Sequence, residues 1–289
     1  MKTTYGMTAI SIFAIGTATC SSVGAVESEI AIIAETGDPA PDGNGSLDLV
    51  AVTGLNDAGD LLVRSTLFGT SGGFADNQAL YLFESGMAGI KIVREGDPSP
   101  DGDGTFEDSS TGVFFSGGLN GATTVAILSD LSGTDGGSAD DAGLFRDTGA
   151  GVGTMLREGD PAPGGGDFQF MYNFNLGEGD HIAFFGGVDT DGNINETPDV
   201  FGFWRVDPDG TVVKLVRSGD PAPGGGSFAP GNNFQRINAS GLTAFNSSIS
   251  GGNFGTFVAD ASTVTSIVQQ GDSIGGGDTV FVARPTSIN

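Results

Sequence analysis

The sequence predicts an all-β protein of tandem four-stranded antiparallel repeats, arranged as a β-propeller of about five blades with an incomplete last blade. Three observations predict this fold class: a loop motif that recurs about every 60 residues, four strand-like runs in each period, and 51 glycines in 289 residues. Abundant glycine beside many phenylalanines favours short strands and tight turns. The alternative architecture is an elongated array of β-repeats.

The recurring loop motif is Gly-Asp-Pro, followed by a small residue and a second proline. Proline fixes the backbone of such a loop, and the aspartate side chain caps nearby amides. The motif divides the chain into repeats at about 37–95, 96–158, 159–218 and 219–270, with a partial repeat at 271–289. Its copies begin at Gly37, Gly96, Gly159 and Gly219, and a degraded copy begins at Gly271.

A second motif, Asn-x-x-Gly-x-x-Ala-Phe, keeps the same phase and is clearest at Asn238–Phe245. The copies that begin at Asn56, Asn120 and Gly177 each depart from it at two positions. Most of the substituted residues tolerate turns and left-handed backbone. The motif therefore predicts a strand, a turn and a returning strand.

Strand-like runs fill the rest of each repeat, and they are rich in aromatic residues, as strands prefer. Pro208-Asp-Gly210 predicts a tight hairpin turn between the last two runs of the third repeat. The runs of the third repeat are Phe168–Asn175, His181–Val188, Val200–Val206 and Thr211–Arg217. Those of the fourth are Phe234–Asn238, Leu242–Ile249, Gly255–Ala259 and Val264–Gln269.

The two ends of the chain resemble parts of a repeat. Glu29–Glu35 aligns with a last strand, Asp278–Arg284 with a first strand, and Ser287–Asn289 with the start of the turn motif. Either the two end strands share one closing blade, or the chain is a truncated copy of a longer protein. The alignment favours truncation, because the chain stops inside a turn.

Residues 1–25 predict a signal peptide, which leaves residues 26–289 as a single β-repeat domain. Lys2 supplies a positive charge, Met7–Ala18 is uncharged and mostly apolar, and Val23–Ala25 offers small residues for cleavage. The expected location is secreted, extracellular or at the cell surface, with no membrane insertion after cleavage. Cys20 is the only cysteine, so cleavage would exclude disulfides, zinc thiolates and cysteine nucleophiles.

The acidic composition bears on the partners of the protein. The formal net charge is −25, from 36 acidic and 11 basic residues. Such a chain repels phosphate backbones and anionic headgroups, so nucleic acids and membrane surfaces are poor partners. The charge is first of all typical of a solvated acidic surface.

The turn motif beside the Gly-Asp-Pro loop resembles that of bacterial secreted tandem-repeat proteins containing NxxGxxAF, which carry varied C-terminal anchors. The resemblance extends over about residues 29–289, and Asn238, Gly241, Ala244 and Phe245 match the motif in full. It implies a secreted or surface-attached repeat protein. It implies no catalytic residues, because no activity is assigned to that family.

Two groups of acidic residues are candidate sites. The loop aspartates Asp38, Asp97, Asp160, Asp220 and Asp272 would form a ring at one rim of a propeller and hold cations or a polar ligand. The alternative is that each one only caps its own turn, since repetition alone creates such rings.

The second candidate is a calcium site in the loop 189–199, which offers oxygen ligands at alternate positions. The proposed ligands are Asp189, Asp191, Asn193, Asn195 and Asp199. The loop departs from an EF-hand, because Gly192 stands fourth and Ile194 sixth. A second acidic cluster lies in Asp97–Asp108.

The pattern as a whole favours a binding or structural module for an unknown extracellular protein or glycan. His181 is the only histidine and is interpreted as a strand residue after a turn. We therefore expect no enzyme and no cofactor apart from Ca²⁺. The alternatives are an extracellular hydrolase or lyase that uses rim carboxylates, and a truncated fragment without a function of its own.

Overall fold

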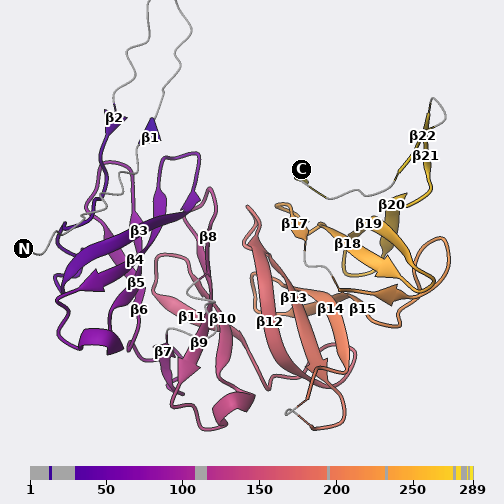
Figure 1. The fold of residues 1–289 in the computed structure, drawn as a ribbon, viewed down its shortest axis with the longest axis horizontal. Helices are drawn as coiled ribbons and strands as arrows, with labels where there is room; N and C mark the ends of the chain where they lie inside the picture. Colours follow the sequence, from indigo (N-terminus) through magenta and orange to yellow (C-terminus); the bar gives the residue numbers. More distant parts are fainter. Residues whose placement is uncertain are drawn as a thin grey trace, which may run out of the picture. The chain divides into compact units, whose positions relative to one another are not determined.

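A computed structural model of the chain describes residues 13–14, 30–107, 116–193, 196–231, 234–275, 278–280, 285 and 287–288. Four antiparallel sheets of four or five strands dominate these residues (Figure 1), so the all-β fold class and the tandem four-stranded repeats are confirmed. None of the four sheets closes on itself. The ring of blades that a propeller needs stays a prediction.

The chain divides into two compact units, residues 1–97 and 98–289, which are described separately. The first unit contains the sheet of the first repeat and a short 3-10 turn η1 (Gly73–Ala75) between its second and third strands. The order of strands in this sheet is β3 (Ser46–Leu55), β4 (Leu61–Phe68), β5 (Gln78–Phe83) and β6 (Ile90–Arg94). Its core includes Leu47, Val63 and Tyr81, one from each of the first three strands.

The second unit contains the other three large sheets, and in each the strands follow one another in chain order. In the second repeat, β7 (Thr105–Glu107) and β8 (Ser116–Leu119) both pair with β9 (Val125–Ser132), followed by β10 (Ala142–Asp147) and β11 (Val152–Arg157). The 3-10 turn η2 (Gly137–Ala139) precedes β10. The third repeat consists of β12 (Asp167–Leu176), β13 (Ile182–Asp189), β14 (Val200–Val206) and β15 (Val212–Arg217).

The fourth repeat has its first strand in two pieces, β16 (Phe228–Ala229) and β17 (Gln235–Ile237), which both pair with β18 (Thr243–Ile249). The sheet continues with β19 (Asn253–Ala259) and β20 (Val264–Gln269). A small hairpin follows, made of β21 (Ser273–Gly275) and β22 (Asp278–Thr279).

The strands predicted from the sequence are confirmed in the third repeat, where every boundary lies within one residue of the prediction. The predicted hairpin turn is also present, since Gly210 N donates to Asp207 O at 2.9 Å. In the fourth repeat the first run was predicted as one strand at Phe234–Asn238. The split into β16 and β17 corrects it, because β18 is long enough to pair with both pieces.

The predicted end strands are shorter in the structure. Within Glu29–Glu35 the strand β2 (Ile30–Ala31) is described, and it pairs with β1 (Phe13–Ala14). Within Asp278–Arg284 only β22 is a strand, and residues 281–284 lie outside the described part. The signal-peptide prediction also falls outside the described residues, apart from 13 and 14. Cleavage before Val26 and a single domain over 26–289 stay predictions.

The sheets of the second unit pack face to face through alternating side chains. Successive residues of a strand point to opposite faces of its sheet. Phe184 and Trp204 of the third repeat therefore join one core with the second repeat, while Phe185 and Phe203 join another with the fourth. Rings meet across the second interface, where the centroids of Phe203 and Phe245 are 4.8 Å apart. The third repeat is thus covered on both faces.

Candidate functional site

Each of the five loop aspartates caps its own turn. One carboxylate oxygen accepts a hydrogen bond from the backbone N–H three residues earlier, in all five copies. The donors and distances are Glu35 for Asp38 (3.0 Å), Arg94 for Asp97 (2.8 Å), Arg157 for Asp160 (2.7 Å), Arg217 for Asp220 (3.0 Å) and Gln269 for Asp272 (2.7 Å). The geometry thus gives these aspartates a structural role, and a ligand-binding ring stays a prediction.

The small residue of the loop motif is required by packing. Ala162 N donates to Gly166 O at 2.8 Å, which closes the loop into a tight turn. The Ala162 side chain is buried against the core of its sheet, as are Ala40 and Ala222 in their repeats. A larger residue would have no room there, because interiors are close-packed.

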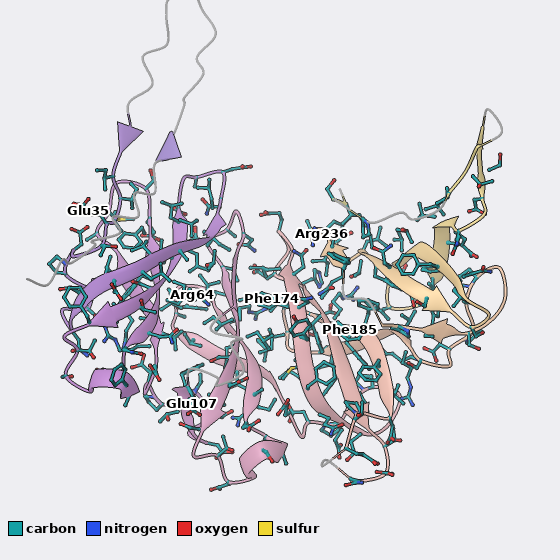
Figure 2. All side chains as sticks on the ribbon, in the orientation of Figure 1. Glu35, Arg64, Glu107, Phe174, Phe185 and Arg236 are labelled. Atoms are coloured by element: carbon teal, nitrogen blue, oxygen red, sulfur yellow. The ribbon has the colours of Figure 1, made fainter. Side chains whose placement is uncertain are left out.

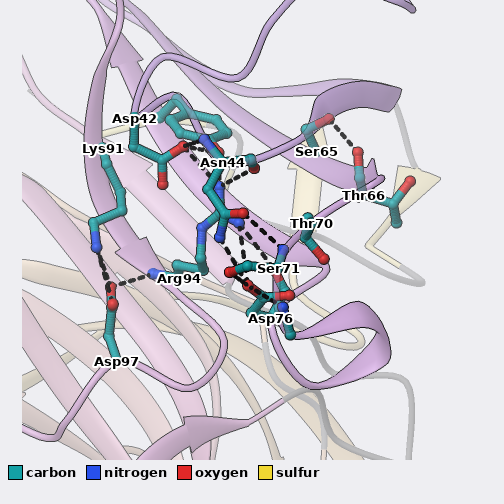
Figure 3. Close-up of polar contacts among 12 residues, drawn as sticks. Asp42, Asn44, Ser65, Thr66, Thr70, Ser71, Asp76, Lys91, Arg94 and Asp97 are labelled. Atoms are coloured by element: carbon teal, nitrogen blue, oxygen red, sulfur yellow. Dashed lines mark hydrogen bonds and ion pairs between the residues drawn. The ribbon is translucent and has the colours of Figure 1, made fainter.

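A side chain at the end of the last strand also forms hydrogen bonds to the loop that precedes the first strand of the same repeat. In the first repeat Arg94, only 4% exposed, donates to the carboxylate of Asp42 at 2.7 Å, to Asn44 O at 3.0 Å and to Asp76 O at 3.0 Å (Figure 3). It also donates to the Tyr81 hydroxyl at 2.9 Å, and burial raises the pKa of Tyr81 to about 12.

An equivalent hydrogen bond between last strand and loop is present in each of the other repeats, with different partners. Arg157 donates to Asp101 at 2.8 Å, Arg217 to Gly164 O at 2.6 Å, and Gln269 to Pro223 O at 2.7 Å. In each repeat, a side chain at the end of the last strand therefore holds the Gly-Asp-Pro loop as part of the fold.

The asparagine of the turn motif caps the turn with its side-chain oxygen. The side-chain oxygen of Asn238 accepts from Ser240 N at 3.1 Å and from Leu242 N at 3.0 Å. Asn56 and Asn120 make the equivalent pairs of bonds in the first and second repeats. The fourth position of the turn has left-handed backbone, with φ of 80° at Gly241 and 61° at Asp180. This confirms the turn that the motif predicts.

The turns of the second unit lie against one another from repeat to repeat. Asn120 donates to Gly177 O at 3.1 Å and to Asp180 Oδ1 at 2.7 Å. Gly121 N donates to the Glu178 carboxylate at 2.7 Å. The second turn is thereby bonded directly to the third.

The contact between the third and fourth turns explains why the third copy of the motif lacks asparagine. A Cβ atom on Gly177 would lie 2.8 Å from Asn238 O, and one on Gly179 would lie 2.0 Å from Ala239 O. Only glycine allows the two backbones to approach so closely. The departure from the motif is therefore a packing requirement of the neighbouring turn.

A pocket of about 490 Å³ opens beside this contact. Its wall combines apolar side chains with one acidic and one basic residue. Its lining includes Leu176, Glu178, Arg236, Ile237, Ser240 and Ile288. Figure 2 labels Arg236 on β17 of the fourth repeat. Sequence reasoning missed this pocket, because no motif marks the place where two turns meet.

The predicted calcium loop brings three of its five residues together. One carboxylate oxygen from each of Asp189, Asp191 and Asp199 lies within 4.8 Å of the others. Asp189 is buried, and its Oδ1 accepts from the backbone N–H groups of Asp191 and Gly192, each at 2.9 Å. The Asp199 carboxylate accepts from the Thr190 hydroxyl at 2.7 Å and from Thr190 N at 2.8 Å, and these bonds lower the pKa of Asp199.

The other two predicted ligands are the amide residues Asn193 and Asn195. Asn193 donates its backbone N–H to Asp191 Oδ1 at 3.0 Å, and Asn195 lies outside the described residues. Of the second acidic cluster, Asp97 caps its turn, Asp101 binds Arg157, and Asp108 is not described. The arrangement thus supplies three carboxylates for a hard cation.

His181, directly after the third turn, is bonded to the carboxylate of Asp207. Its Nδ1 lies 2.8 Å from Asp207 Oδ1, and Arg205 binds the same carboxylate while donating to Gly241 O at 2.7 Å. Burial raises the pKa of Asp207, but the bonds from Arg205 and His181 outweigh it and lower that pKa. His181 does follow a turn, as predicted. Its pairing with Asp207 was not predicted from the sequence.

A comparison with protein families shows which family the chain matches. Residues 17–259 match the model of DUF7453, a family of unknown function. This chain belongs to the DUF7453 family. The match covers the four Gly-Asp-Pro loops and all four turn motifs of the DUF7453 chain. No curated protein matches it.

The recurring residues of this DUF7453 member thus serve its fold, as caps, ties and buried small residues. Two features depart from the repeat: the pocket beside the third and fourth turns, and the loop 189–199. Loops held by a rigid scaffold are where binding residues concentrate. These two features are the candidate functional sites.

Proposed function

We propose that this DUF7453 chain is a secreted or cell-surface binding module that holds an extracellular ligand in the pocket beside its third and fourth turns. The observation that carries the proposal is the pocket itself, whose volume of about 490 Å³ lies in the usual range for small-molecule sites. It opens where two glycines permit an unusually close approach of two turns. Apolar walls with a few polar groups are typical of such sites.

The secreted location rests on sequence features. Residues 1–25 have the charge and hydropathy of a signal peptide, and the turn motif resembles that of secreted NxxGxxAF repeat proteins. Among the described residues, none of the helical segments has the length and hydropathy of a membrane span.

Filling the pocket with a bulky side chain is expected to abolish ligand binding without unfolding the protein. Ser240 lines the pocket, is exposed and is the third residue of its turn. In Ser240→Trp the indole would occupy the pocket. The full chain and this variant would be compared on arrays of glycans and extracellular proteins.

The matched control is Ala122→Trp, at the same position of the second turn, where the backbone N–H makes the same bond to the capping asparagine. Binding should survive Ala122→Trp and be lost in Ser240→Trp, with similar melting temperatures. Equal binding by both variants, or no binding by the folded wild-type chain, would contradict the proposal.

Calcium binding by the loop 189–199 is a second prediction, favoured by the three converging carboxylates. A ligand that binds only the folded state stabilises it, by about 2.7 kcal/mol at a concentration one hundred times Kd. Millimolar calcium should therefore raise the melting temperature of the wild-type chain relative to a chelator. Asp191→Asn should remove that rise. Asp209→Asn, which changes another exposed turn aspartate, should keep it. A wild-type melting temperature that is the same with calcium and with chelator would refute the site.

A further inference from the structure

We propose that the pocket takes a neutral carbohydrate of one or two sugar rings, held between Glu178 and Arg236. This inference rests on the proposed function and names the ligand class. Glu178 comes from the turn of the third repeat and Arg236 from β17 of the fourth. The pocket therefore carries a hydrogen-bond acceptor and a hydrogen-bond donor on walls that belong to different repeats.

The acidic wall is oriented before any ligand arrives. Glu178 is exposed, and its Oε2 accepts from Gly121 N at 2.7 Å. A carboxylate has about four acceptor positions. One of them is used by Gly121 of the second turn, and the Glu178 carboxylate keeps the capacity to accept bonds from a ligand.

The basic wall is fixed in a similar way. Arg236 is exposed, and its Nη1 donates to Gln235 O at 2.8 Å. A guanidinium has five N–H donors in a rigid fork. A hydroxyl group both donates and accepts. The hydroxyl groups of a sugar are thus chemically complementary to both walls.

Apolar groups complete the fit to a sugar, whose ring faces consist of C–H groups. Leu176, Ile237 and Ile288 supply apolar surface inside the pocket. Phe234 stands two residues before Arg236, and the residue is 39% exposed. Asn246 N donates to Phe234 O at 3.2 Å, so the pairing with β18 extends to Phe234 and places it on the same side of the strand as Arg236.

The charge of the chain selects a neutral ligand over an acidic one. A net charge of −25 creates a field that repels anionic saccharides. A zwitterion would have to give up the hydration of both its charges to enter the pocket, and that loss is costly. Hydroxyl groups carry a smaller desolvation cost, so the neutral sugar is the better match.

The test titrates the full chain with maltose, cellobiose and lactose, and in parallel with glucuronic acid and glycine, by isothermal calorimetry. Glu178→Gln and Arg236→Met are the variants, and Glu84→Gln is the matched control in the first unit. We expect at least one disaccharide to bind the wild-type chain. Each pocket variant should weaken that binding about tenfold or more, because hydrogen bonds to charged groups are the strong ones. Glu84→Gln should leave it unchanged.

Binding of only glucuronic acid or glycine would overturn the inference, as would a disaccharide that binds equally to both pocket variants. If no sugar binds but Ser240→Trp still abolishes an array signal, the proposed function stands and the ligand class is wrong. If neither the sugars nor the arrays give a signal with the folded chain, both are wrong.

Discussion

Glu158→Gln is expected to stabilise the chain at pH 7 and to flatten its loss of stability between about pH 5 and pH 9. Glu158 is 7% exposed, and burial raises its pKa from 4.5 to about 9, with further contributions from a hydrogen bond and charge of Asp141 and the charge of Asp130. Between these two values the folded state keeps a proton that the unfolded state has lost. Stability therefore falls as pH rises through this window, by up to about 1.4 kcal/mol per pH unit.

Glutamine keeps the shape of the protonated side chain and never ionises. At pH 7 the variant should gain about 3 kcal/mol of unfolding free energy, measured by urea denaturation at pH 5, 7 and 9. The control is Glu95→Gln in the first repeat, where the side chain accepts from Asn77 N at 3.1 Å and an asparagine stands in place of Asp141. The same pH slope in the wild-type chain and in Glu158→Gln would contradict this account.

Arg94→Met is expected to destabilise the first unit by about 3–5 kcal/mol, the range for breaking a buried ion pair by removing one partner. Methionine would fill the space of the stem but leave the Asp42 carboxylate and the Tyr81 hydroxyl without their guanidinium (Figure 3). The loss should appear in urea denaturation followed by circular dichroism.

Lys91→Met is the comparison, because it removes another cation from the same strand, β6. The Lys91 ammonium lies 2.9 Å from the Asp97 carboxylate, and both side chains are about a third exposed. An exposed pair of this kind contributes at most about 1 kcal/mol. Equal losses in the two variants would show that the buried Arg94 network does not hold the loop.

The repeat period and the strands could be predicted from the sequence because glycine and proline mark turns by local chemistry. That is why the strands of the third repeat were placed within one residue. The split between β16 and β17 was not predicted, since it depends on the length of the partner strand β18. The 3-10 turns η1 and η2 were also missed, because nothing in their composition separates them from a loop.

The candidate sites were predictable only in part. Asp189, Asp191 and Asp199 converge as expected, because they lie in one short loop. The pocket could not be predicted, since it forms where Gly177 and Gly179 meet a turn some 60 residues away along the chain. His181 directly precedes β13 and Asp207 directly follows β14, so the register of these two strands brings the pair together.

The central claim is that the recurring aspartates stabilise the fold as caps of their own turns. The most direct test replaces Asp38, Asp97, Asp160, Asp220 and Asp272 with asparagine together, and measures thermal melts with calcium and with chelator. Asparagine keeps an oxygen that can cap the turn but removes the charge that a cation needs. The account predicts a folded variant with the same calcium response as the wild-type chain. Loss of a calcium-dependent rise in melting temperature, in a variant that still folds, would contradict it.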